Sequence, residues 1–212
     1  MTGARLANLV MHAELEGLIC SGPRRGKQST YALIAERAPN ARRLSRDEAL
    51  AELSRRFFQS HGPATPRDFS WWSGLTMADA KRGLEMNGGR REDVGDLCYW
   101  CVGKPRKEST SDTGAHLLPI YDEYLVSYRD RVAVPHGPST IPSGRTSVTF
   151  QHAIVIAGQV AGTWRHATRT ATAVALAGAL LRPITKRERR ALDEAAKRYE
   201  RFVGRPVTLT VS

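Results

Sequence analysis

The apolar residues at the start of the chain follow a helical spacing and then become continuous. Residues 4–19 carry apolar side chains at mostly helical intervals, and Leu18–Cys20 is an apolar run typical of a short strand. A basic turn over 21–27 leads into residues 28–34, whose alternation predicts a returning strand. This order matches the second half of a winged helix, so residues 1–37 are predicted to form a partial winged helix. The apolar positions of its helix are Leu6, Leu9, Val10 and Ala13.

The middle of the chain carries three helix-start signals. Each is a Ser or Thr followed by a proline or, three residues later, by an acidic residue, which is the pattern of a capped helix. The three capping residues are Ser45, Thr65 and Thr76. Gly74 provides a turn between the second and third helices, and this predicts a helix-turn-helix. The apolar positions expected to face its core are Leu50, Leu53, Phe57, Met77, Ala80 and Leu84.

A wing is expected after the third helix. Residues 97–102 form a strand-like run rich in aromatic side chains, and residues 103–115 form a polar loop that contains three basic residues. Residues 116–120 fit the return limb of that wing. Residues 45–131 are therefore predicted to form one complete winged helix.

A loop rich in proline and glycine separates this region from the rest of the chain, where the pattern changes. Residues 152–164 are predicted to form a β-hairpin with a two-residue turn, and a loosely alternating strand follows over 170–181. A helix that Thr185 caps comes next, and a last strand is predicted over 207–211. Residues 145–212 are predicted to form a small α+β domain, and the whole chain is assigned to the α+β class. The apolar positions expected to point inward from the helix are Leu192, Ala195, Tyr199 and Phe202.

The charge balance changes this picture from a fold to a class of function. The 212 residues contain 32 Lys and Arg against 21 Asp and Glu, a net charge of +11. The positive electrostatic field of such a protein attracts polyanions, and DNA is the favoured partner. An anionic membrane surface and the arginine-rich usage of some genomes are the alternatives.

The cysteines and histidines give little support for a metal, a cofactor or a disulfide framework. Three cysteines are an odd number, which favours a reducing compartment and a cytoplasmic protein. Cys98 and Cys101 form a C-x-x-C motif, but strand geometry points their thiols to opposite faces. No metal site and no cofactor are predicted. No apolar run reaches the roughly 18 residues that span a bilayer, so no membrane partner is expected.

The residues predicted to contact DNA follow from the two winged-helix patterns. The third helix of a winged helix enters the major groove while the wing touches phosphates, and basic hairpin tips add phosphate contacts. The alternative interpretation is that these side chains only solvate the surface of a protein-interaction module. The predicted DNA-binding residues are Arg24, Arg25, Lys27, Thr76, Lys81, Arg82, Lys104, Arg106 and Lys107.

Two further pairs could carry chemistry, and each has a structural alternative. Trp71 and Trp72 could stack on bases, but core filling is the favoured interpretation. Asp122 and Glu123 are adjacent carboxylates that could act as a general base in a cleft. A surface turn or a helix cap is the favoured interpretation of the second pair.

Several strings resemble those of a bacterial winged-helix DNA-binding family that contains crosslink-repair DNA glycosylases, including the azinomycin-resistance type. The strings are His61–Thr65, Asp68–Leu75, Leu117–Leu125, Tyr128–Arg131 and Val160–Arg165. The resemblance implies tandem winged helices that hold alkylated DNA, with base removal in the members that are enzymes.

The resemblance fails at the residues that it would assign to catalysis. It implies a Gln-x-Gln or Gln-x-Asp motif in an N-terminal winged helix, but none of the four glutamines, Gln28, Gln59, Gln151 and Gln159, begins such a motif. The leading hypothesis is therefore a DNA-binding protein without base excision of its own. An active glycosylase that uses Asp122 or Glu123 and a protein-interaction module are the alternatives.

The first helix also predicts a partner. A recognition helix normally buries its apolar stripe against two preceding helices, and the sequence before it has no room for them. Its apolar positions are therefore expected to lie partly uncovered or to pack against a second copy or another protein.

Overall fold

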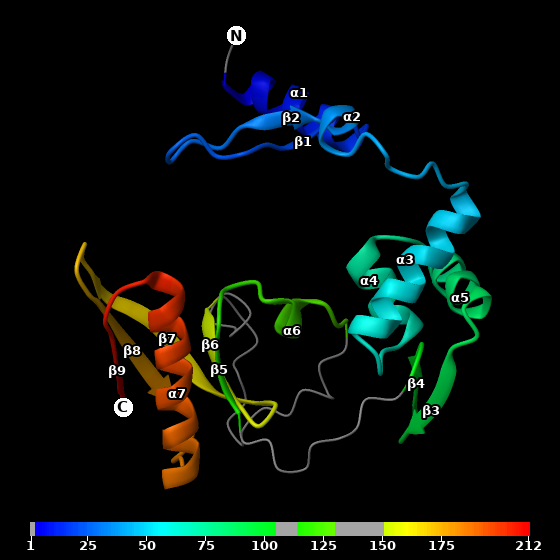
Figure 1. Ribbon diagram of the computed structural model, residues 1–212. Helices are drawn as coiled ribbons and strands as arrows, with labels where there is room; N and C mark the ends of the chain where they lie inside the picture. The colour runs from blue at the N-terminus through cyan, green and yellow to red at the C-terminus, as the bar shows by residue number, and fades with distance from the viewer. Residues whose placement is uncertain (1–2, 105–113, 130–150) are drawn as a thin grey trace. The chain divides into compact units, whose positions relative to one another are not determined.

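The structure is a computed structural model in which residues 3–104, 114–129 and 151–212 are described (Figure 1). The chain divides into two compact units, residues 1–46 and residues 47–212. No helix in these described ranges is long and apolar enough to cross a membrane.

The first unit is a helix followed by a short hairpin. Helix α1 (Gly3–Leu15) precedes strands β1 (Ile19–Ser21) and β2 (Tyr31–Leu33), which pair antiparallel, and a single helical turn, α2 (Ile34–Arg37), follows. The predicted helix, strand, basic tip and returning strand are confirmed, although the returning strand is shorter than predicted. Leu6 and Leu9 are 52% and 56% exposed in the single chain, and the partner expected for this helix stays a prediction.

The second unit begins with the three predicted helices. They are α3 (Arg46–Ser60), α4 (Pro66–Ser73) and α5 (Met77–Met86). The predicted caps form at α4 and α5, where Thr65 and Thr76 each accept a hydrogen bond from the backbone N–H three residues later. The prediction that Leu53 and Met77 face the core is wrong, because they are 36% and 41% exposed. The buried core residues are Leu50, Phe57, Phe58, Ala64, Phe69, Ala80 and Leu84.

A hairpin that differs from the predicted wing follows α5. Strand β3 (Arg90–Val94) pairs antiparallel with β4 (Leu97–Cys101), and Ala64 exchanges backbone hydrogen bonds with Trp100 of β4 at 3.0 and 2.8 Å. The prediction that β4 pairs with residues 116–120 is wrong. Every residue of β3 is exposed, so this strand has no alternation of apolar and polar positions by which to predict it.

A five-stranded sheet forms the rest of the second unit. Its order is β5 (Ala115–Leu118), β6 (His152–Ile156), β7 (Gln159–Arg169), β8 (Val174–Leu180) and β9 (Val207–Val211). All neighbouring strands are antiparallel except β8 and β9, which are parallel. The predicted hairpin, the strand after it and the last strand are confirmed. The predicted return limb of the wing is instead the edge strand β5 of this sheet.

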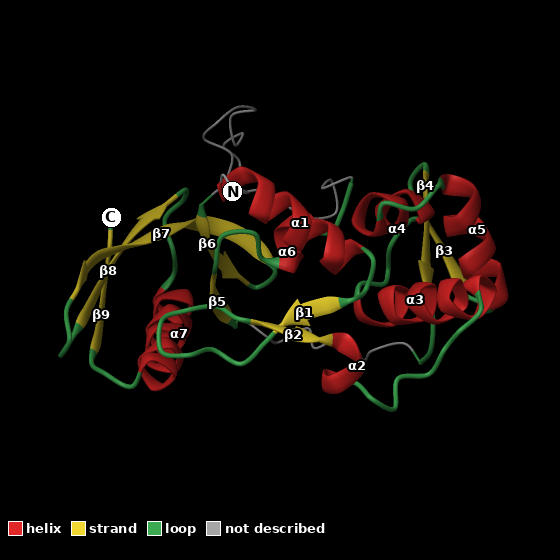
Figure 2. Cartoon of the chain, turned by 90° about the horizontal axis from the view of Figure 1, so that it is seen from above, coloured by secondary structure: helices red, strands yellow, loops and turns green. Residues whose placement is uncertain are grey.

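Helices cover the two faces of this sheet. Helix α7 (Lys186–Val203) lies along one face, as Figure 2 shows, and buries Leu192 and Ala195 against Ile154 and Leu176. The short helix α6 (Glu123–Val126) brings Leu125 into a separate cluster with residues of β6 and β7.

The predicted boundaries of α7 are confirmed by its caps. Thr185 and Glu188 form a reciprocal capping box at the start, and Gly204 ends the helix in the left-handed conformation at φ 67°. The prediction that Phe202 points inward is wrong, because its side chain is 84% exposed.

Candidate nucleic-acid interface

Of the residues predicted to contact DNA from α5, Thr76 caps the helix, and Lys81 and Arg82 are exposed on its surface. Thr76 Oγ1 accepts from the backbone N–H of Asp79 at 3.1 Å and donates to the Asp79 carboxylate at 2.8 Å, so this hydroxyl is used by the helix itself. Lys81 and Arg82 are exposed. Arg82 lies 2.6 Å from the Asp47 carboxylate, and an exposed ion pair of this kind is weak enough for a phosphate to compete with it.

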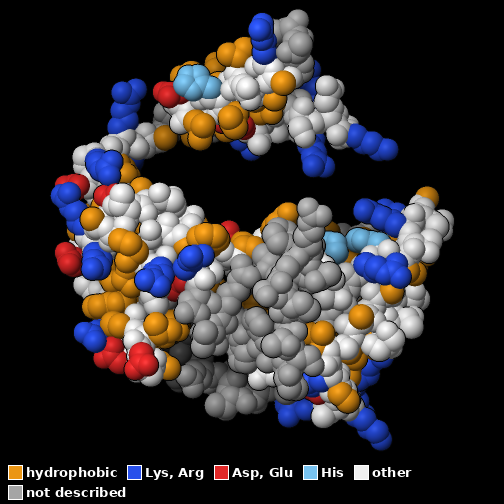
Figure 3. Space-filling model, turned by 180° about the vertical axis from the view of Figure 1, so that it is seen from behind, with side chains coloured by type: hydrophobic (Ala, Val, Ile, Leu, Met, Phe, Trp, Pro, Cys, Tyr) orange, Lys and Arg blue, Asp and Glu red, His pale blue; other side chains and the backbone are white. Residues whose placement is uncertain are grey.

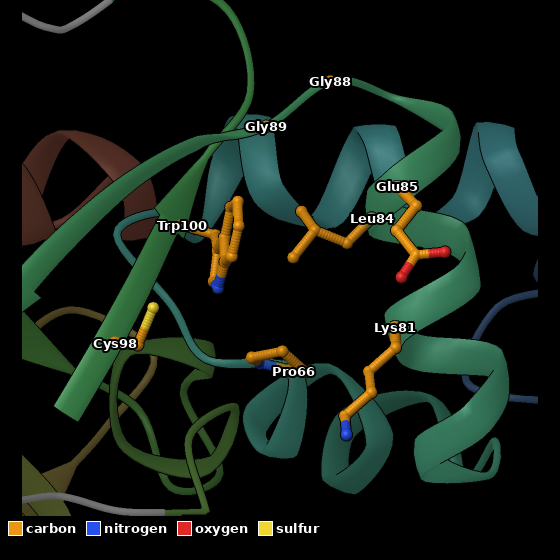
Figure 4. Close-up of a pocket in the computed structure, with 8 residues that line it drawn as sticks. All are labelled: Pro66, Lys81, Leu84, Glu85, Gly88, Gly89, Cys98 and Trp100. Atoms are coloured by element: carbon orange, nitrogen blue, oxygen red, sulfur yellow. The ribbon is translucent and has the colours of Figure 1, made fainter.

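A cavity of about 390 Å³ lies between α5 and strand β4. Lys81 and Glu85 of α5 are among the residues that line it, and Figure 4 shows Trp100 and Cys98 on strand β4 at the other side. Burial raises the pKa of the Cys98 thiol, and the nearby Asp93 side chain raises it further. A raised pKa disfavours the thiolate, which is the nucleophilic form of cysteine.

The basic tip of the first unit is a compact group of charges. Arg24, Arg25 and Lys27 are all exposed within four residues of one turn. The turn is fixed by two backbone hydrogen bonds of 3.1 Å between Arg25 and Gln28, and by Thr30 Oγ1, which donates to the Pro23 carbonyl at 2.7 Å. The three cations therefore project from a defined hairpin tip.

The remaining predicted contacts belong to the loop after β4. Lys104 is exposed at the end of the described part of that loop. Arg106 and Lys107 lie outside the described residues.

The basic charge of the protein is unevenly distributed along the fold. Residues 47–101, which hold α3 to β4, contain seven basic and nine acidic residues. Residues 1–46 contain eight basic and three acidic residues, and residues 165–205 contain eleven and four. At the left of Figure 3, over the α3–α5 region, Lys and Arg side chains are accordingly mixed with Asp and Glu. The net positive charge of the protein therefore comes from residues outside the α3–β4 region.

A cluster that the sequence did not predict forms around the carboxylate of Glu123. Trp72 Nε1 donates to it at 3.1 Å, His61 Nε2 lies 3.2 Å from it, and the Ser127 hydroxyl also donates to it. The hydrogen bond from Ser127 is the main reason that the pKa of Glu123 lies below its usual range, and those from His61 and Trp72 add to it. Because the side chain of Glu123 is 63% exposed, it is an ionised carboxylate that is open to solvent.

The two tryptophans do not fill the core as predicted. Trp71 is 52% exposed, its Nε1 donates to the Val126 carbonyl at 3.1 Å, and the Arg129 guanidinium lies 5.1 Å from its ring centre. Trp72 is 36% exposed and packs its inner edge on Phe57. The core-filling prediction is therefore wrong for Trp71 and holds for one side of Trp72.

Buried Asp68 ties this cluster to the start of α4. Its carboxylate accepts from the backbone N–H and the hydroxyl of Thr65, each at 2.8 Å, and from the backbone N–H of Arg129 at 2.8 Å. Tyr128, whose pKa burial raises to about 12, donates to the His61 carbonyl at 2.8 Å. The cluster therefore joins four of the five strings that the sequence singled out separately.

The adjacent carboxylates have different roles. Asp122 caps α6 by accepting from the backbone N–H of Tyr124 at 3.0 Å, as the helix-cap interpretation predicted. Only Glu123 reaches the cluster. Among the described residues, no group of three His, Cys, Asp or Glu side chains could hold a metal ion.

Comparison with known proteins identifies the family. The family model described as "DNA glycosylase AlkZ-like" matches residues 1–202, so the chain belongs to the AlkZ-like DNA glycosylase family, and the family predicted from the sequence strings is confirmed. The fold is similar to that of the Streptomyces sahachiroi DNA glycosylase AlkZ, with a TM-score of 0.67 and 21% identity. That match covers 92% of this chain and 55% of the other, so this chain spans about half the length of that protein. No curated protein matches the chain.

Proposed function

We propose that this chain binds duplex or damaged DNA in a repair role, without base excision of its own. The family supports a DNA partner. The observation that carries the proposal is the fixed basic tip formed by Arg24, Arg25 and Lys27, because exposed cations at a hairpin tip suit the phosphate backbone. A DNA partner would place the protein in the bacterial cytoplasm.

The proposal includes two winged helices, one partial over residues 1–37 and one complete around α3 to β4. Lys81 and Arg82 would face the groove from α5, with Thr76 at its start and Lys104, Arg106 and Lys107 beyond the hairpin. Since the α3–β4 region carries more acidic than basic residues, it adds little general attraction to DNA. Binding would then depend on phosphate contacts from other parts of the chain and show little sequence preference.

The proposed binding predicts a strong dependence on salt. Three phosphate contacts from the tip alone give a slope of log affinity against log salt of about −2.7, or an affinity loss of about 40-fold between 50 and 200 mM NaCl. Fluorescence anisotropy with a labelled 20-base-pair duplex measures this, and a duplex of scrambled sequence should bind within a few-fold. A flat salt response, or no binding at low salt, would contradict the proposed function.

Base excision is a second candidate, which the Glu123 cluster favours. A glycosylase must stabilise positive charge that develops on the sugar, and a fixed, ionised carboxylate does this well. Glu123 is held by three donors, is open to solvent and lies beside exposed indole rings. Against this candidate, no glutamine of the chain begins the motif that the family resemblance implies.

Release of free base separates the two candidates. We expect no release when the protein is incubated with duplex DNA that contains N7-methylguanine, beyond the spontaneous loss that mass spectrometry measures without protein. The alternative predicts release by the unchanged protein, a loss of at least about 100-fold in Glu123→Gln, and no loss in Glu16→Gln, an exposed glutamate of the first unit. That pattern would replace the binding-only proposal with an enzyme centred on Glu123.

A further inference from the structure

The end of helix α7 leaves a large aromatic ring in water. Phe202 is 84% exposed, more than any other exposed large apolar side chain in the described part of the protein. A single exposed apolar side chain needs no explanation by itself. Phe202, however, is the outermost ring of a connected aromatic series that begins in the core.

This series holds the ring of Phe202 on a rigid support. Its centre lies 6.2 Å from the ring of Tyr199, which in turn lies 5.6 Å from the buried Trp164. The Tyr199 hydroxyl is 2.8 Å from His166 Nε2 on strand β7. The chain beyond the helix is also fixed, because the Glu200 carboxylate accepts from the Val207 backbone N–H at 2.8 Å. The backbone that carries Phe202 is therefore anchored before any ligand binds.

Three arginines lie close to Phe202 along the chain. Arg198 lies one helical turn before Phe202, Arg201 is adjacent to it, and Arg205 follows the helix end. Arg205 Nη1 donates to the Thr170 carbonyl at 2.6 Å, which brings the β7–β8 turn to the same place. Arg198 Nη2 donates to the Ala115 carbonyl of β5, but within the described ranges none of the three arginines forms an ion pair with a carboxylate.

The nearby acidic groups are already engaged. Glu194 pairs with Lys197 at 2.7 Å, and Glu200 accepts from the backbone as described above. Residues 165–205 contain eleven basic and four acidic residues, a larger basic excess than residues 1–46 or 47–101. Charge complementarity thus favours a phosphate-bearing partner over an apolar protein surface.

We propose that the end of α7, formed by Tyr199, Phe202, Arg198, Arg201 and Arg205, binds a DNA strand at an unpaired base. The base would stack on Phe202 while the arginines contact the flanking phosphates. A base inside a regular duplex is stacked on its neighbours and paired, so a protruding phenyl ring gains contact only with a base that has left the helix. This inference rests on the proposed DNA-binding function and adds a preference for unpaired bases.

The test compares single-stranded with duplex DNA for one substitution. Labelled 20-nucleotide single strands and 20-base-pair duplexes are titrated with the whole chain and with Phe202→Ala. The affinity for the single strand should fall by about 5- to 30-fold, the lower part of the range for stacking of one base, with duplex affinity unchanged. Phe202→Trp should restore or improve binding to the single strand. Because the side chain is exposed, the melting temperature should not change.

Two further variants test the charges. Arg201→Ala should weaken binding to the single strand several-fold and reduce its salt slope by about 0.7. Arg190→Ala removes the same charge about 16 Å away along α7, and it should have a smaller effect. Leu15→Ala, which truncates another exposed apolar side chain, should change neither affinity.

The outcomes separate this inference from the proposed function. If the unchanged protein binds duplex DNA but Phe202→Ala leaves single-strand affinity intact, or lowers both affinities equally, the inference is overturned and the proposed function stands. If the unchanged protein binds single strands but not duplex DNA, and Phe202→Ala weakens the single-strand binding, the inference stands and the proposed duplex binding is overturned. A change of oligomeric state in Phe202→Ala by analytical ultracentrifugation, with unchanged DNA binding, would assign the ring to a protein contact and overturn the inference.

Discussion

Asp68→Ala should lower the free energy of unfolding by about 3 kcal/mol, a large effect for one side chain. Asp68 is 2% exposed, and its carboxylate accepts hydrogen bonds from the backbone N–H and hydroxyl of Thr65 and from the backbone N–H of Arg129. Alanine leaves these donors without the carboxylate in a region that water does not reach, and a buried unpaired donor costs more than the original bond contributed. Urea denaturation followed by circular dichroism measures the change.

Asp79→Ala is the matched control for this prediction. Asp79 holds the same position in α5 that Asp68 holds in α4, three residues after the capping threonine, but its hydrogen bond with Thr76 is exposed. Its loss should cost about 1 kcal/mol or less, since water replaces the carboxylate. Equal effects of the two substitutions would show that capping alone, and not the buried connection to Arg129, makes Asp68 important.

The sequence predicted the features that depend on close neighbours. Thr65, Thr76 and Thr185 were each expected to begin a helix, and each does, because a cap joins a side chain to a backbone N–H only three residues away. Gly204 ends α7 as expected for a residue in the left-handed region. These elements need no information about the rest of the fold.

Features that depend on distant partners were missed or misplaced. Strand β3 is exposed along its whole length and has no apolar period, so only its pairing with β4 reveals it. Strand β5 was assigned to a wing, yet it pairs with β6, which lies more than thirty residues later in the chain. The helical spacing of Phe202 matched that of Leu192, but at the end of α7 the neighbouring Val203 packs against the sheet core and Phe202 is left exposed.

The candidate site followed the same division. Basic residues could be selected from the sequence, but which of them dominate the positive electrostatic potential depends on how they are distributed over the fold. The predicted recognition region, residues 47–101, contains more acidic than basic residues. In the Glu123 cluster, His61 and Glu123 are in contact although they lie 62 positions apart in the sequence. Its members were visible only as separate strings of the family resemblance, because their hydrogen bonds are tertiary contacts.

Simultaneous replacement of Arg24, Arg25 and Lys27 by alanine should reduce affinity for duplex DNA on the order of 100-fold at 0.1 M salt. Each phosphate contact releases about 0.9 counterions. Three contacts therefore raise the affinity at 0.1 M salt by a factor of up to roughly 500 over the affinity at 1 M salt. The slope of log affinity against log salt should become less steep by about 2.7. Anisotropy titrations at several NaCl concentrations give both quantities.

A second triple variant distinguishes local contact from loss of overall charge. Replacing Lys186, Arg187 and Arg190 by alanine removes the same three charges from the exposed start of α7. If the tip of the first unit contacts phosphates directly, its triple variant loses far more affinity and slope than this control. Similar losses would instead show that DNA responds to the net charge of +11 as a whole, and the tip would have no special role. The tip variant should keep its melting temperature, because its three side chains are exposed and its turn is fixed by backbone bonds and Thr30.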